Sequence, residues 1–296
     1  MTAALGVVLA LLGVVLGLVL SRHESSTTAH TPTVRGTTTQ PQPRSRPPGR
    51  SRADLALDRL IRIGLPVYCG GDRGRLVALT FDDGPGPYTA FALTILRRWH
   101  AHATFFLVGR NLARWPDAPR RELKVAALGD HTWTHAYLLA LPAPEIDSEL
   151  ARTQLAIARA GHRPVRLFRP PYGAHNAAVD AQAHALGMLE VLWSIDSRDS
   201  EGANFMAIRN NVMREIRPGS IVLMHENRGQ TIRALYYHVF RDLRRRGLRP
   251  VSVPELLARD PPTPARSCAG VGGSRARSSG TLTGRKPRRR RSRKTW

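Results

Sequence analysis

Apolar and polar positions alternate in blocks between residues 55 and 260. Six short runs rich in β-branched and aromatic residues predict strands: "RLVALTF" (75–81), "ATFFLVG" (103–109), "PVRLFR" (164–169), "LEVLWSID" (189–196), "GSIVLMH" (219–225) and "RPVSV" (249–253). Amphipathic stretches between them predict helices at 88–100, 145–161, 204–216 and 233–247. This alternation indicates an α/β domain with a mainly parallel sheet, either an open doubly wound sheet or a barrel.

Polar side chains follow most of these apolar runs. The residues concerned are Asp82 and Asp83, His131 and His135, Arg169 and Tyr172, Asp196 and Asp199, and His225. In both candidate architectures the carboxyl ends of the strands meet on one face, which is where functional residues gather. We therefore expect one site built from five separate segments.

Each of these signals is weak alone. A "DDG" turn is usually solvated, and two histidines four residues apart are common on protein surfaces. Together, one carboxylate and two imidazoles suit Zn²⁺ or a similar divalent ion with positions left open for water and substrate. Such an ion would neutralise one of the two adjacent aspartates and let the other stay ionised as a base.

Composition bounds the rest of the chain. The 296 residues, 42% of them hydrophobic, can bury one sizeable core with residues left over for tails. The net charge of +23 is concentrated at the C-terminus, because residues 261–296 hold 11 Lys and Arg residues and no acid. Such a tail can bind anionic polymers or lipid headgroups or be simply solvated, and it has too little aromatic interleaving to indicate base recognition.

Residues 3–20 are uninterrupted apolar residues, enough to span a bilayer. We expect residues 1–20 to be an uncleaved membrane anchor rather than a signal segment, because a basic start and a clear cleavage site are missing. Residues 21–65 are assigned to a Ser/Thr/Pro/Arg-rich linker, residues 66–260 to a single catalytic domain, and residues 261–296 to a basic disordered tail.

Cys69 and Cys268 stand near the two edges of the central region. Their spacing excludes CxxC redox and zinc-ribbon motifs. In an exported domain they can form a disulfide, and otherwise they are two unrelated thiols.

The segments "TFDDGP", "HTWTH", "RPPYG", "DSRD" and "LMH", in this order, resemble the five motifs of the polysaccharide deacetylases, the NodB-homology carbohydrate esterases of family 4. The resemblance covers residues 70–258 and implies a distorted (β/α) barrel with a groove over the strand ends. It also implies that Asp83, His131 and His135 hold a divalent metal ion, with Zn²⁺ expected first and Co²⁺, Mn²⁺ or Ni²⁺ as alternatives.

The resemblance implies roles for the remaining motif residues. Asp82 would be the general base, held ionised by Arg169, and Thr132 would brace the metal-binding loop. The backbone N–H of Tyr172 would stabilise an oxyanion. His225 would be the general acid, with its tautomer fixed and its pKa raised by Asp196.

Two departures from the family pattern concern the acetyl pocket and the second motif. Ser200 follows Asp199 where the family usually has a Trp, so that Leu223 remains as the other wall of the pocket. The segment before His131 is also shorter than the family's usual glycine-rich approach, which predicts a trimmed second strand–helix unit.

The function that these features predict is metal-dependent N-deacetylation of N-acetylglucosamine-type residues in peptidoglycan or a chitin-like polymer. O-deacetylation of acetylxylan is the alternative substrate class, and a non-catalytic carbohydrate-binding relative is the alternative protein class. Such a polymer lies outside the membrane, so we expect a membrane-anchored extracytoplasmic protein, or a secreted one if the N-terminal segment is cleaved. We also expect a monomer.

Overall fold

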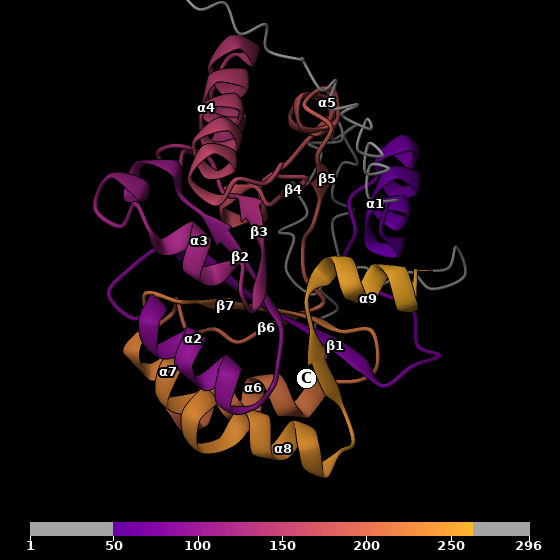
Figure 1. Cartoon of the computed structure of the whole chain (residues 1–296), viewed down its shortest axis with the longest axis vertical. Helices are drawn as coiled ribbons and strands as arrows, with labels where there is room; N and C mark the ends of the chain where they lie inside the picture. The colour runs from indigo at the N-terminus through magenta and orange to yellow at the C-terminus, as the bar shows by residue number, and fades with distance from the viewer. Residues whose placement is uncertain (1–49, 263–296) are drawn as a thin grey trace, which may run out of the picture. The chain divides into compact units, whose positions relative to one another are not determined.

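The computed structural model describes residues 50–262, and Figure 1 shows the arrangement of the helices and strands. The strands are β1 Leu76–Gly84, β2 Ala103–Leu107, β3 Ala126–Asp130, β4 Leu167–Phe168, β5 Leu189–Glu190, β6 Ile195–Asp196, β7 Ile221–His225 and β8 Arg249–Val251. The α-helices are α1 Arg52–Ile63, α2 Thr89–Arg98, α3 Ala118–Glu122, α4 Ala143–Gly161, α5 Ala177–Ala185, α6 Phe205–Glu215, α7 Gly229–Ala234, α8 Phe240–Arg245 and α9 Val253–Arg259. Short 3₁₀ turns at 109–113, 138–140 and 171–173 and a π-helical turn at 235–239 complete the elements.

All the strand pairs in the sheet are parallel, in the order β5-β4-β3-β2-β1-β7-β6, with β8 paired to β1. The sheet curls into a distorted, open (β/α) barrel, as the resemblance implied. β1 is an interior strand between β2 and β7 and is buried along nearly its whole length, which explains why its sequence is an apolar run rather than an alternating one. The carboxyl end of β1 therefore lies in the middle of the functional face.

The predicted strand over 189–196 is wrong in one respect, because the run forms two short strands at opposite ends of the sheet. β5 pairs with β4, whereas β6 pairs with β7. Residues 191–194 cross between these two edges, and the backbone carbonyls of Val191 and Leu192 accept hydrogen bonds from the Arg169 side chain. The interruption is therefore where the barrel stays open.

The linker assignment is wrong for residues 52–63, which form α1. Ser51 and Asp54 build a capping box at its N-terminus, and Gly64 ends it in the left-handed conformation that glycine adopts readily. Leu57 and Ile61 are buried in a second hydrophobic cluster, and α1 packs beside α9 (Figure 1). The folded domain therefore begins before residue 66.

Several predictions fall on residues 1–49 and 263–296, which lie outside the described residues. They are the anchor at 1–20, most of the linker, the basic tail and the partner that Cys268 would provide for Cys69. Within residues 50–262, no helix combines the length and the apolar character needed to cross a bilayer.

The packing of α1 can be tested with two leucines of the same helix. Leu57 is 4% exposed, whereas Leu55 is 53% exposed. We expect Leu57→Ala to lower the free energy of unfolding by about 2–4 kcal/mol and Leu55→Ala to change it by less than about 0.5 kcal/mol. Chemical denaturation of the two variants measures the difference, and equal effects would contradict the docking of α1 on the domain.

Candidate active site

The structure brings the motif residues together at the carboxyl ends of the central strands. β1 ends on Asp82, Asp83 and Gly84, β7 ends on His225, and the loop after β3 carries His131 and His135. Parallel strands place these ends on one face of the sheet. The register pairs Asp82 of β1 directly with His225 of β7, so the backbone fixes the separation of these two residues.

Asp82 forms a buried ion pair with Arg169. The Nη1 group of Arg169 donates to Asp82 Oδ1 at 2.8 Å, and the two side chains are 0% and 4% exposed. The same guanidinium donates to Thr80 Oγ1 and to two backbone carbonyls, and it stacks over the ring of Phe106 at 4.2 Å. A buried charge pair is stable only when its remaining hydrogen-bonding groups are satisfied, and Arg169 meets that condition.

Asp83 faces the two histidines. Its Oδ1 atom lies 3.2 Å from His135 Nε2 and 3.7 Å from His131 Nε2, and it is buried without a hydrogen bond in the described part of the chain. Burial acts to raise the pKa of Asp83, but the adjacent imidazoles, first that of His135, outweigh burial and lower it. One carboxylate oxygen and two Nε2 atoms form a ligand set that fits a divalent ion such as Zn²⁺.

Hydrogen bonds around the two histidines fix their orientation. His131 Nδ1 lies 2.7 Å from the backbone carbonyl of Arg169, to which its N–H donates, leaving Nε2 free to face Asp83. Burial lowers the pKa of His131, which favours the neutral form that binds metals. The Thr132 hydroxyl accepts a hydrogen bond from the backbone N–H of His135 at 3.0 Å, the bracing contact expected from the resemblance.

The site loops hold non-glycine residues in the left-handed region. Within residues 50–262, seven non-glycine residues have positive φ, and five of them lie in the motif segments: Asp83, Thr132, His135, Tyr172 and Arg198. Each such residue costs on the order of 1 kcal/mol and persists only where its surroundings hold it in place. The strained backbone conformations are therefore concentrated in the segments that direct the side chains of the site.

Gly84 is required by a close approach. A Cβ at this position would lie 1.3 Å from Glu226 Oε1, so the buried Glu226 side chain occupies the space that any other residue would need. The glycine of the "DDG" segment therefore reflects packing beneath the two aspartates.

His225 contacts Asp199, which corrects the prediction for Asp196. Asp199 accepts hydrogen bonds from His225 Nδ1 and from the His225 backbone N–H, both at 2.7 Å, whereas Asp196 Oδ1 accepts one from the Arg198 backbone. Burial acts to lower the pKa of His225, but Asp199 and then the charges of Asp82 and Asp83 raise it to about 9. At neutral pH His225 is therefore an imidazolium whose Nε2 remains available to donate a proton.

Sequence reasoning chose the wrong aspartate in "DSRD". The left-handed Arg198, with φ of 57°, turns the chain between the two residues and brings Asp199 under His225. Thr231 also donates to Asp199, which places this carboxylate among three donors. The only signal in the sequence was that both candidates stand in the same motif.

The residues predicted to meet the substrate lie around this centre. Tyr172 is 65% exposed. The centroid of its ring lies 4.8 Å from the centroid of the His135 ring, and the two rings meet edge-on. The backbone N–H of Tyr172 makes no hydrogen bond to another described residue. Leu223 is buried in β7, and Ser200 is exposed on the loop after β6.

Comparisons with known proteins agree with this geometry. Residues 70–191 match the family described as polysaccharide deacetylase. A peptidoglycan-N-acetylglucosamine deacetylase from Bacillus cereus is 36% identical over 190 residues, which cover 62% of this chain and 88% of that protein. A bifunctional xylanase/xylan deacetylase from Cellvibrio japonicus is 34% identical over 182 residues, which cover 61% of this chain and 27% of that protein.

A solved structure shows the same fold. It is a CE4 family pseudoenzyme from Bacillus anthracis, with a TM-score of 0.62 and 31% identity, and the match covers 66% of this chain and 69% of that one. With the five motifs gathered on one face of an open barrel, the chain belongs to the polysaccharide deacetylase family.

Proposed function

We propose that this protein removes acetyl groups from N-acetylglucosamine-type residues of peptidoglycan or a chitin-like polymer and releases acetate. The observation that carries the proposal is the arrangement of Asp82 and Asp83 at one strand end. Asp83 faces two imidazoles in a ligand set, while Asp82 forms an ion pair with Arg169 and lies opposite the imidazolium of His225. A base, a cation site and an acid thus converge on one point.

Asp83, His131 and His135 would hold the divalent ion, for which we propose Zn²⁺. When bound, such an ion polarises a carbonyl and lowers the pKa of water to about 7. Asp82 accepts the proton of the attacking water, and its ion pair with Arg169 fixes the direction of the carboxylate.

The other groups act on the acetyl carbon and on the leaving nitrogen. The Tyr172 N–H donates to the oxygen that becomes negative when water adds to the carbonyl, a contribution typically worth about 3–4 kcal/mol. His225 then transfers its Nε2 proton to the departing amine, and Asp199 stabilises the imidazolium before this transfer. The amine and acetate are the products.

Two alternatives remain distinct from this proposal. O-deacetylation of acetylxylan is favoured by the relative named as a xylan deacetylase. A non-catalytic role is favoured by the pseudoenzyme of the same fold. The present chain retains all three ligands of the candidate metal site together with its base and acid, which supports a catalytic role.

The test of the proposal is acetate release from peptidoglycan, chitooligosaccharides and acetylxylan. We expect the full chain to act on the N-acetylated polymers, to lose activity with a chelator and to regain it with Zn²⁺. His131→Ala should lower the rate about 100-fold or more because it removes a metal ligand, whereas His102→Ala, at an exposed position, should not. Undiminished activity after chelation or in His131→Ala would refute the mechanism, and preference for acetylxylan would favour the alternative substrate.

The division of labour between the two aspartates gives a second prediction. Asp82→Asn keeps an oxygen that can accept from Arg169 but cannot take a proton, so we expect kcat to fall by about 100-fold or more with unchanged zinc content. Elemental analysis and kinetics measure both. Because Asp82 Oδ2 lies 3.6 Å from His131 Nε2, loss of zinc in this variant would instead make Asp82 a ligand.

The hydrogen bond between Asp199 and His225 gives a pH prediction. Since the raised pKa keeps His225 protonated up to about pH 9, activity is present below that pH and is lost as pH rises through it. Asp199→Asn removes the charge that raises this pKa, so the alkaline limb of the kcat profile should move to lower pH by about one unit or more. The kcat profile of Asp196→Asn should keep its alkaline limb. If Asp196→Asn moves the limb and Asp199→Asn does not, Asp196 is the residue that orients His225.

A further inference from the structure

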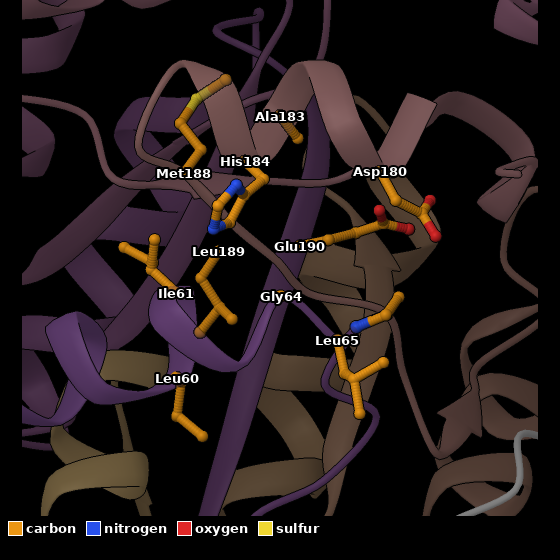
Figure 2. A pocket seen from close by; sticks show the side chains of 11 residues that line it. Leu60, Ile61, Gly64, Leu65, Asp180, Ala183, His184, Met188, Leu189 and Glu190 are labelled. Carbon is orange, nitrogen blue, oxygen red and sulfur yellow. The ribbon is translucent and has the colours of Figure 1, made fainter. Parts of the chain in front are cut away.

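A second cluster of candidate ligands lies outside the active site, at the edge of the sheet formed by β5. It consists of His175 in the loop before α5, Asp180 in the first turn of α5, and Glu190 at the end of β5. Figure 2 shows the carboxyl groups of Asp180 and Glu190 side by side at one end of a pocket whose other walls are mainly apolar. None of these residues takes part in the proposed reaction.

Glu190 is unusual because its carboxyl group is buried with no Arg or Lys beside it, and among the described residues only the His175 ring lies within ion-pair distance. The residue is 5% exposed, and neither of its oxygens accepts a hydrogen bond within the described part of the chain. Over residues 50–262, no Arg or Lys lies within 4.0 Å of Glu190 or of Asp180. A buried carboxylate without a countercharge is strongly unfavourable, so this position calls for a cation or a proton.

His175 cannot satisfy both carboxylates. Its Nδ1 atom lies 3.0 Å from Asp180 Oδ1 and 3.3 Å from Glu190 Oε1, and a ring nitrogen carries one proton at most. Its other nitrogen, Nε2, lies 3.2 Å from the Tyr68 hydroxyl oxygen. If Nε2–H donates to Tyr68, Nδ1 is left as a bare nitrogen that faces two carboxylate oxygens, which is the orientation of a metal-bound imidazole.

We propose that His175 Nδ1, Asp180 and Glu190 bind a second divalent cation of the Zn²⁺ class. The three ligand atoms lie within 4.8 Å of one another, close to the separations of about 3–4 Å that Zn²⁺ distances of about 2.0–2.2 Å produce. One imidazole and two carboxylates match the ligands of zinc sites, and solvent from the partly exposed side of Asp180 can supply the fourth. The cation neutralises the two carboxylates at once.

The competing explanation is a proton shared by the two carboxyl groups. Without a cation, burial and then the charge of Asp180 raise the pKa of Glu190 to about 9, so the acid would be neutral at pH 7. This explanation predicts that no metal binds at the cluster, and the experiment below separates the two.

A cation at this cluster would join three parts of the domain. His175 stands three residues after Tyr172, whose ring contacts that of His135. The backbone carbonyl of Glu190 accepts from Val67, and Tyr68 contacts His175, so the segment before β1 is held there as well. The proposed ion therefore fixes the far end of the loop that begins at Arg169 and carries Tyr172.

The experiment counts zinc in the full chain. The double variant His131→Ala/His135→Ala removes two active-site ligands and should bind one Zn²⁺ fewer per chain than the wild type. It should keep one equivalent of zinc, bound at the second cluster. Adding Glu190→Gln, which keeps the shape of the side chain, should remove that equivalent, and adding His184→Ala should not, although His184 lines the same pocket. Elemental analysis after gel filtration measures the content.

Thermal unfolding gives a readout that does not depend on activity. Zn²⁺ should raise the Tm of the His131→Ala/His135→Ala variant and of the variant that adds His184→Ala, but not of the variant that adds Glu190→Gln or Asp180→Asn. Asp180 is partly exposed. Asp180→Asn therefore tests the same cluster with less risk that the substitution prevents folding than Glu190→Gln at the buried position. A zinc content and a Tm shift that are unchanged by Glu190→Gln and Asp180→Asn would overturn the proposal, as would the absence of bound zinc from the double variant.

Discussion

The buried ion pair between Arg169 and Asp82 is the interaction on which the rest of the site depends. The guanidinium reaches Asp82 and Thr80 on β1 and the two carbonyls in the segment between β5 and β6, and the backbone carbonyl of the same residue orients His131. Breaking a buried pair by removing one partner typically costs about 3–5 kcal/mol. The packing of these segments and the position of the Asp82 carboxylate therefore both depend on Arg169.

Around this pair the site is organised by backbone geometry more than by side-chain flexibility. Register places Asp82 opposite His225, and left-handed residues aim Asp83, His135 and Tyr172. Arg169 and the proposed cation at His175 hold the loop of Tyr172 at its two ends. Arg169 pairs with Asp82 and His225 pairs with Asp199, whereas Asp83 faces the two imidazoles of the ligand set. Each of these three aspartates therefore has its own partner.

Much of this could be predicted from sequence because the motif residues stand next to recognisable strands. Asp82 and Asp83 follow "VALTF", and His225 follows "IVLM", so the parallel pairing of these two strands brings the three residues together. The choice between Asp196 and Asp199 depended on a left-handed turn at Arg198, which no residue type announces. The docking of α1 depended on α9, almost 200 residues away, and the break between β5 and β6 depended on where the Arg169 side chain lies.

The unequal burial of the ligand set has an evolutionary consequence. His131 is 2% exposed and is tied to Arg169, whereas the side chains of His135 and Asp83 are 25% and 21% exposed. A lineage that no longer needs the reaction can therefore replace His135 or Asp83 with little damage to the core, but replacing His131, Asp82 or Arg169 disrupts it. Decay of activity should begin on the exposed side of the ligand set, so that inactive descendants keep the barrel and its buried ion pair long after they lose the chemistry.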